Sequence, residues 1–215
     1  MIKNIFWDWN GTLLDDLDLS LDILNALLEE FGYPQRFTAD SYREIFGFPI
    51  EAYYTRVGFD FRKHPYPLLA LRYMDRYNAA VPTCPAMAHA AETLAQLQQR
   101  GFQQFILSAS RRDYLIEQVA ARGLKGYFTE LLGLSDIYGV SKVQVGLEYL
   151  QASGLDPASC VMVGDTDHDA EVAAAMGIRC ILIANGHQNR DRLEAVCPTI
   201  LNDLTELPSV LAAHN

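Results

Sequence analysis

Carboxylate and hydroxyl side chains follow the first apolar segment of the chain. The run from Ile2 to Trp7 ends abruptly at Asp8, and Asn10, Gly11 and Thr12 come directly after it. This pattern is typical of a buried strand whose carboxyl end delivers Asp8 to the edge of a sheet. In open parallel sheets ligands bind at that edge. The pattern therefore predicts a binding or catalytic site, although an aspartate that only caps a turn has the same local signature.

A second acidic group follows another strand-like run, Cys160 to Val163. Asp165, Asp167 and Asp169 come after Gly164, which places three carboxylates within five residues. Carboxylates so close together repel one another unless a cation lies among them. Mg²⁺ prefers oxygen ligands, and Asp8 and Asp165 are the candidates to hold it. Taken alone, these acids could instead complement the dipole of the helix that begins there.

Two further polar residues stand at positions that suit the same site. Ser108 follows the strand-like run 105–107, and Lys142 follows the 139–141 turn at the start of a predicted helix. Each has an ordinary structural interpretation by itself, since Ser108 could cap a helix and Lys142 could be a solvated helix residue. Their order along the chain, together with the two acidic groups, favours a single site at one edge of a sheet.

Two kinds of segment must position these residues. Residues 16–82 show helical periodicity without a strand signal, whereas residues 83–215 alternate between helices and strands, as does the segment 1–15. Ser110 and Asp113 have the spacing of a capping box for a helix that ends near Arg122. We expect strands at 2–7, 102–107, 131–134, 160–163 and 179–184. Such alternation predicts an α/β fold, a doubly wound parallel sheet in a core of residues 1–15 and 83–215, with 16–82 inserted as an all-helical domain.

The composition narrows the class of partner. The 215 residues contain 17 Lys and Arg against 27 Asp and Glu, so the net charge is −10. This charge disfavours nucleic acids and anionic membranes as partners. The four cysteines have no metal-binding spacing, and reduced thiols are expected. No secretion signal or membrane-spanning run is visible, so we expect a cytoplasmic protein.

The ordered motifs resemble those of the haloacid dehalogenase superfamily. They are D-x-x-G-T-L-x-D at 8–15, a strand ending in Ser108, the isolated Lys142, and G-D-x-x-x-D at 164–169. The helical insertion, with R-E-I-F-G-F-P at 43–49 and G-L-x-x-Y-F at 123–128, resembles the cap of the phosphoglycolate phosphatase and β-phosphoglucomutase branch. The resemblance implies a mobile lid and magnesium-dependent phosphoryl transfer to a small phosphorylated substrate through an aspartyl-phosphate.

The resemblance also implies a role for each matching residue. Asp8 would be the nucleophile, and Mg²⁺ would be held by Asp8, the backbone carbonyl of Asn10 and Asp165, with Asp169 at the metal site orienting the water bound to the metal. Ser108 and Lys142 would bind phosphoryl oxygens. The other residues expected to contact the substrate are Gly11, Thr12, Ala109 and the cap residue Arg43.

The chain departs from this family at residue 10, where the phosphatases carry a second aspartate that acts as general acid and base. Asn10 cannot transfer a proton near neutral pH. Three hypotheses follow. The protein is a hydrolase that acts on phosphates with good leaving groups, with His168 or His64 as a substitute acid; or it is a phosphate-binding protein or slow phosphotransferase; or it cleaves carbon–phosphorus or carbon–halogen bonds, with Lys63 as the one lysine of the cap.

Overall fold

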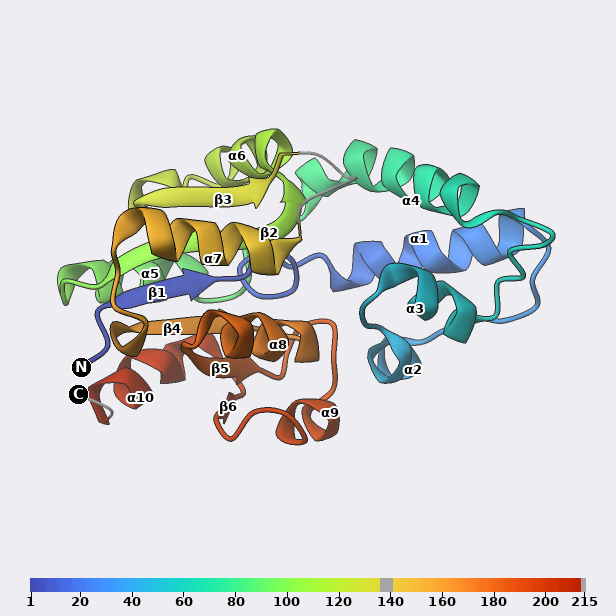
Figure 1. Cartoon of the computed structure of the whole chain (residues 1–215). Coiled ribbons are helices and arrows are strands. Elements are labelled where there is room, and N and C mark those ends of the chain that lie inside the picture. Colours follow the sequence, from blue (N-terminus) through green and yellow to red (C-terminus); the bar gives the residue numbers. More distant parts are fainter. Residues whose placement is uncertain (136–140, 214–215) are drawn as a thin grey trace.

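Six parallel strands form one sheet in the computed structural model, which describes residues 1–135 and 141–213 (Figure 1). The strand order is β3-β2-β1-β4-β5-β6. The strands are β1 (Asn4–Trp7), β2 (Gln103–Arg111), β3 (Glu130–Leu134), β4 (Cys160–Gly164), β5 (Arg179–Ile183) and β6 (Ile200–Leu201). The central position of β1, between β2 and β4, brings its carboxyl end close to the ends of both neighbours. The predicted doubly wound α/β fold is confirmed.

Helices cover both faces of this sheet, as strands buried on both sides require. Alternate side chains of β1 divide between two apolar clusters, with Ile5 and Trp7 in one and Phe6 in the other. On the core side, α5 (Ala90–Gln99), α6 (Arg112–Ala121) and α10 (Leu207–Ala213) contribute to the Trp7 cluster, which also extends into the helices between residues 17 and 80. Those that contribute to the Phe6 cluster are α7 (Lys142–Ser153) and α8 (Asp167–Met176).

Four helices lie together beyond the carboxyl ends of the strands, at the end of the molecule opposite to both termini (Figure 1). They are α1 (Leu17–Glu30), α2 (Ala39–Ile45), α3 (Ile50–Val57) and α4 (Tyr66–Ala80). Thr38 begins α2 with a capping box, as its residue type suggests. This helical group occupies the predicted insertion, and we call it the cap. The exact division into a core of 1–15 and 83–215 and a cap of 16–82 stays a prediction.

Several details of the sequence prediction are wrong. Ser110 and Asp113 do not form a capping box, because β2 continues to Arg111 and Asp113 instead accepts hydrogen bonds from Arg111. The strand at 179–184 does not complete the sheet, since β6 follows it along with α9 (Arg190–Glu194) and α10. A two-residue strand carries too little periodicity to be visible in a sequence. Residues 139 and 140 of the predicted turn before Lys142 lie outside the described residues.

Within residues 1–135 and 141–213, every helix is too short or too polar to cross a lipid bilayer.

The segment 186–192, which follows β5, holds the cap against the core, and we call it the cap-contact segment. The carbonyl of Gly186 accepts a hydrogen bond from Arg43 Nε at 2.9 Å, and Gln188 Nε2 donates to the carbonyl of Phe46 at 3.1 Å. Arg192 donates through Nη1 to three carbonyls of the cap, those of residues 43, 44 and 46. Its other nitrogen, Nη2, donates to Asp167 Oδ2 at 2.7 Å. Arg192 thus ties the end of α2 to the start of α8.

We predict that Arg192→Ala loosens the cap without unfolding the core. Hydrogen bonds from a charged donor contribute about 1.5–3 kcal/mol, so amide hydrogen exchange in residues 42–49 should become roughly 10-fold faster or more. Arg190→Ala is the matched control, because Arg190 bonds Glu194 and Asn202 within the core. Equal exchange rates of residues 42–49 in the two variants would contradict the conclusion that Arg192 holds the cap against the core.

Candidate active site

Lys142 forms a buried ion-pair centre with two of the predicted acids. Its Nζ donates to Asp8 Oδ1 at 2.5 Å and to Asp169 Oδ1 at 2.6 Å. Asp8 follows the end of β1, Lys142 is the first residue of α7, and Asp169 lies in the first turn of α8. Lys142 is only 4% exposed, and the chain folds it inward because its two partners satisfy its charge. Three elements far apart in the sequence therefore meet at this centre.

Asp165 is fully buried beside these residues and is held from two sides. Thr12 Oγ1 donates to its Oδ1 at 2.8 Å, and the backbone N–H of His187 donates to its Oδ2 at 2.7 Å. Gly11 has a φ of 72°, and a Cβ there would lie 2.3 Å from Asp165 Oδ2. A Cβ on Gly186 would lie 2.2 Å from the same oxygen. Only glycine leaves room for this carboxylate at both positions.

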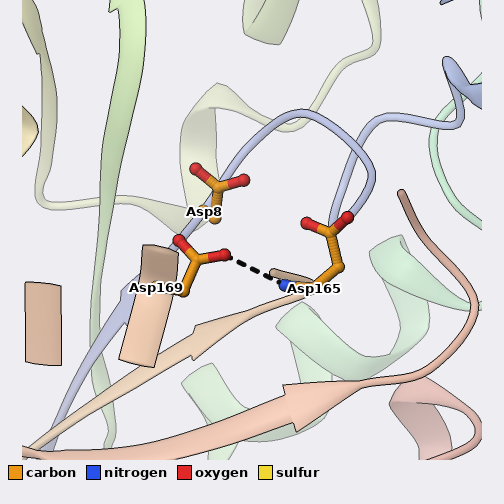
Figure 2. Close-up of side chains that lie close together, drawn as sticks. All are labelled: Asp8, Asp165 and Asp169. Atoms are coloured by element: carbon orange, nitrogen blue, oxygen red, sulfur yellow. Dashed lines mark hydrogen bonds between the residues drawn. The ribbon is translucent and has the colours of Figure 1, made fainter. Parts of the chain in front are cut away.

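The carboxyl groups of Asp8, Asp165 and Asp169 gather around one space at the carboxyl ends of β1 and β4 (Figure 2). One oxygen from each lies within 4.8 Å of the others. Three ionised carboxylates carry one charge each, and Lys142 compensates one of the three, so two negative charges remain. A divalent cation with oxygen ligands, such as Mg²⁺, matches both this charge and this donor chemistry.

The pKa values of these groups reflect the same imbalance. Burial raises the pKa of Asp8 to about 6 and that of Asp165 to about 7, despite the opposing effects of Lys142 on Asp8 and of His187 on Asp165. Burial also opposes ionisation of Asp169, but the charge of Lys142 and hydrogen bonds from Lys142 and Thr166 bring its pKa below the usual value. Lys142 is therefore matched to Asp169 and only partly neutralises Asp8.

Asn10 is fully engaged by neighbours that sequence reasoning did not single out. Its Nδ2 donates to Asp16 Oδ2 at 2.9 Å and to the hydroxyl of Tyr77 at 2.6 Å, and its Oδ1 accepts from Ser110 Oγ at 2.9 Å. Tyr77 comes from α4 of the cap. The pair of acids at residues 15 and 16 was visible as a boundary of the insertion, but nothing in the sequence indicates that Asp16 turns back to residue 10.

Asp16 accepts four hydrogen bonds although it is only 2% exposed. In addition to Asn10, its partners are the hydroxyl of Tyr77 at 2.6 Å, the N–H of Gly11 at 2.9 Å and His187 Nε2 at 3.1 Å. Burial raises the pKa of this carboxyl, yet His187, Tyr77 and Asn10 together hold it below its usual value. Asp16 is therefore ionised at neutral pH, and it fixes both Asn10 and the turn at Gly11.

His187 links this carboxylate to the cap. Its Nδ1 lies 3.0 Å from the hydroxyl of Tyr42, and its ring is buried against Phe46. Burial lowers the pKa of His187, but the charge of Asp16 outweighs this effect and raises it to about 9. His187 is thus predominantly protonated at pH 7. The sequence analysis did not single out His187, because it belongs to none of the four motifs.

Comparison with known proteins identifies the chain. The sequence model described as haloacid dehalogenase-like hydrolase matches residues 5–183. The chain belongs to this family. It is therefore a hydrolase of the haloacid dehalogenase type, as the ordered motifs predicted.

Two relatives of this hydrolase match nearly its whole length. It is 28% identical over 214 residues to a phosphoglycolate phosphatase of Synechococcus elongatus, a match that covers 98% of this chain and 95% of that protein. It is 23% identical to the pyrophosphatase PpaX of Bacillus pumilus, covering 99% of this chain and 97% of that protein. A predicted phosphatase from Clostridium acetobutylicum has the same fold, with a TM-score of 0.84, 18% identity and 99% of each chain covered.

The other predicted site residues of this hydrolase lie in the turn after β1, in β2 and in the cap. Ser108 is 1% exposed in β2, and its Oγ accepts a hydrogen bond from the N–H of Ser110 at 3.1 Å. Ala109 lies between them and is exposed. Thr12 uses its hydroxyl on Asp165, and Arg43 uses Nε on the cap-contact segment. The substrate roles of Gly11, Thr12, Ser108, Ala109 and Arg43 stay predictions.

The substitute acids considered from the sequence have other partners. His168 Nδ1 lies 3.0 Å from Glu171 and its ring stacks on Phe48, while His64 Nδ1 lies 2.9 Å from the hydroxyl of Tyr33. Throughout residues 1–135 and 141–213, neither histidine hydrogen-bonds to Asp8 or Asn10. Asp167 does not belong to the group of Asp8, Asp165 and Asp169. Its carboxylate instead accepts hydrogen bonds from Arg192 and Gln188.

Metal binding at this site should depend on pH. Because burial raises the pKa of Asp8 to about 6 and of Asp165 to about 7, both carboxyls gain protons as the pH falls through this range. A cation must displace these protons, so Mg²⁺ affinity should decrease about 10- to 100-fold between about pH 7.5 and about pH 5.5.

Titration calorimetry in buffers of different ionisation enthalpy measures both the affinity and the protons released. Asp165→Asn should abolish binding, whereas Asp167→Asn is the matched control outside the acidic group. A Mg²⁺ affinity that stays constant over this pH range would be inconsistent with buried, proton-retaining ligands.

Proposed function

We propose that this protein is a magnesium-dependent phosphatase that acts on a small phosphorylated metabolite through an aspartyl-phosphate at Asp8. The observation that carries the proposal is the buried centre in which Asp8, Asp165 and Asp169 surround one space with Lys142 paired to Asp8. The names of two relatives, a phosphoglycolate phosphatase and a pyrophosphatase, support the same reaction class.

Asp8 and Lys142 have complementary tasks in this reaction. A carboxylate oxygen of Asp8 attacks phosphorus, the bond from phosphorus to the leaving oxygen breaks, and water later cleaves the aspartyl-phosphate to release phosphate and restore Asp8. Lys142 keeps Asp8 ionised before the attack and offers positive charge to the phosphoryl oxygens. Asp8, the Asn10 carbonyl and Asp165 would hold Mg²⁺, which neutralises charge between nucleophile and phosphate when it is bound.

Protonation of the leaving group is the step at which we expect this chain to differ from the family's phosphatases. Asn10 has no proton to transfer, and Asp16, the carboxyl beside it, is kept ionised by four donors. Neither group can protonate a departing alkoxide. We therefore propose substrates whose leaving group needs little protonation, such as acyl or aryl phosphates and phosphoanhydrides.

The alternatives are less well supported. A slow phosphotransferase or phosphate-binding protein would share the centre and differ in the fate of the aspartyl-phosphate, so kinetics must separate it from a phosphatase. Carbon–phosphorus cleavage would need a lysine facing the substrate, whereas Lys63 is exposed in the loop before α4. Carbon–halogen cleavage leaves Asp165 and Asp169 without a role.

Turnover of an aryl phosphate tests the proposal. Purified protein with Mg²⁺ should hydrolyse p-nitrophenyl phosphate and acetyl phosphate, and it should lose activity with a chelator. Asp8→Asn should abolish turnover and the acid-stable phosphoprotein, whereas Asp18→Asn, an exposed acid of α1, should leave both unchanged. A phosphoprotein that persists without steady release would favour the phosphate-binding alternative, and activity retained in Asp8→Asn would refute the mechanism.

Exchanging residues 10 and 16 tests the explanation of the leaving-group step. Asn10→Asp alone places a second carboxylate where the amide now lies, 2.9 Å from Asp16 Oδ2. The buried like charges should lower the free energy of unfolding by about 2–4 kcal/mol at neutral pH. The double variant Asn10→Asp/Asp16→Asn keeps one amide and one carboxylate, and it should recover most of this loss.

The same double variant should gain a general acid at residue 10. Such groups contribute roughly 10²–10⁴-fold, so kcat/KM for alkyl phosphates should rise by that order while aryl phosphates change little. Thermal unfolding and kinetics with both substrate types measure the two effects. The explanation fails if Asn10→Asp alone is as stable as the natural chain, or if the exchange leaves alkyl phosphate hydrolysis unchanged.

A further inference from the structure

A cavity of about 480 Å³ lies at the end of the sheet opposite to the active site. Its lining includes Ile2, Val161 and Arg179, which stand at or near the amino ends of β1, β4 and β5. Asp8 and Asp165 follow the carboxyl ends of β1 and β4, so the two sites are separated by the length of the strands. The cavity is therefore distinct from the phosphoryl-transfer centre.

Two cysteine side chains meet in the wall of this cavity. Cys180 is the second residue of β5, and Cys197 precedes β6. Cys197 Sγ donates to the carbonyl of Cys180 at 3.4 Å and to that of Thr199 at 3.4 Å, and the two side chains pack in one apolar cluster. Cys197 is only 3% exposed, Cys180 is partly exposed, and both are free thiols.

The short pairing between β5 and β6 explains why the thiols meet there. The two strands pair at Leu182 with Ile200 and at Ile183 with Leu201, so the ladder begins only after Cys180. Cys197 therefore takes the place of a strand neighbour beside the Cys180 carbonyl. Leu193 and Ile200 pack around the same thiol and keep it at the edge of the sheet.

We propose that Cys180 and Cys197 are a redox-active thiol pair that forms a reversible disulfide by exchange with a small disulfide, such as oxidised glutathione, in this cavity. The exposed residues Arg179, Val196 and Pro198 surround the pair and give access from solvent. The positive charge of Arg179 suits an anionic thiol compound such as glutathione.

The exchange proceeds in two balanced steps. One cysteine of the pair, as a thiolate, attacks one sulfur of the small disulfide, forms a mixed disulfide and displaces one small thiolate, which takes up a proton. The other cysteine, as a thiolate, then attacks the protein sulfur of this mixed disulfide and displaces the second small thiolate. Two protein thiols are oxidised, and one small disulfide is reduced to two thiols.

The disulfide would close a loop that contains the whole cap-contact segment, residues 186–192, including His187 and Arg192. Oxidation would therefore brace the segment that binds the cap and restrict its local unfolding.

Mass spectrometry of the folded protein tests the pair. After incubation with oxidised glutathione, the protein should become lighter by two hydrogen atoms, and a peptide map should link Cys180 to Cys197. Cys84 and Cys160 are internal controls that should stay reduced. Dithiothreitol should reverse the change. Formation of the link only under denaturing conditions, or a preference for Cys84 or Cys160, would overturn the proposal.

Single variants test the internal link. In Cys180→Ser and in Cys197→Ser the loss of two hydrogen atoms should disappear, and the remaining cysteine of the pair should carry glutathione as a mixed disulfide. Circular dichroism under reducing conditions checks that each variant is folded. An internal disulfide that still forms in either variant would refute the pair.

Discussion

The structure depends on a buried excess of negative charge at the carboxyl ends of β1 and β4. Asp8, Asp165 and Asp169 share one space with a single lysine, which is matched mainly to Asp169. Burying uncompensated charge is costly, and the chain accommodates it by surrounding the carboxylates with backbone N–H groups, Thr12 and glycines that cannot clash. A divalent cation with oxygen ligands would compensate the charge that remains.

The contact between Asn10 and Asp16 joins an amide to a buried carboxylate. An amide and a carboxylate form a complementary pair, and a carboxylate at both positions would repel. The ionised Asp16 also attracts His187 and Tyr77, which brings the core, the cap-contact segment and the cap to one carboxylate. The side chain of Asn10 is therefore linked to the placement of the cap through Tyr77 and Asp16.

This coupling gives the cap-contact segment two tasks. Through the N–H of His187 it positions Asp165, and through Gly186, Gln188 and Arg192 it binds the end of α2. If the cap moves, either these hydrogen bonds break or the cap-contact segment moves with it. Access to Asp8 and the position of Asp165 are therefore linked. Cys180 and Cys197 lie on either side of this segment in the sequence. A disulfide between them would limit the same motion without contacting the acidic group.

The order of helices and strands along the chain was enough to predict the class of fold and the members of the charged centre. Asp8, Lys142, Asp165 and Asp169 were found because parallel strands and the helices that follow them bring their ends to one edge, which depends only on element order. Helix α8 was placed from Asp167 to Met176 because its strand, acidic first turn and final glycine are all local signals. The two-residue β6 and the continuation of β2 past Leu107 depend on pairing with neighbours, so local patterns could not reveal them.

Only the tertiary structure decided which polar groups meet around residue 10. Asp16, Tyr77, Ser110 and His187 come from four separate parts of the chain, and their hydrogen bonds to one another or to Asn10 reflect cap placement rather than spacing. The same holds for Asp167, which Arg192 draws away from the acids beside it. Hydrogen bonds between distant side chains depend on precise orientation in three dimensions, which residue type and periodicity do not specify.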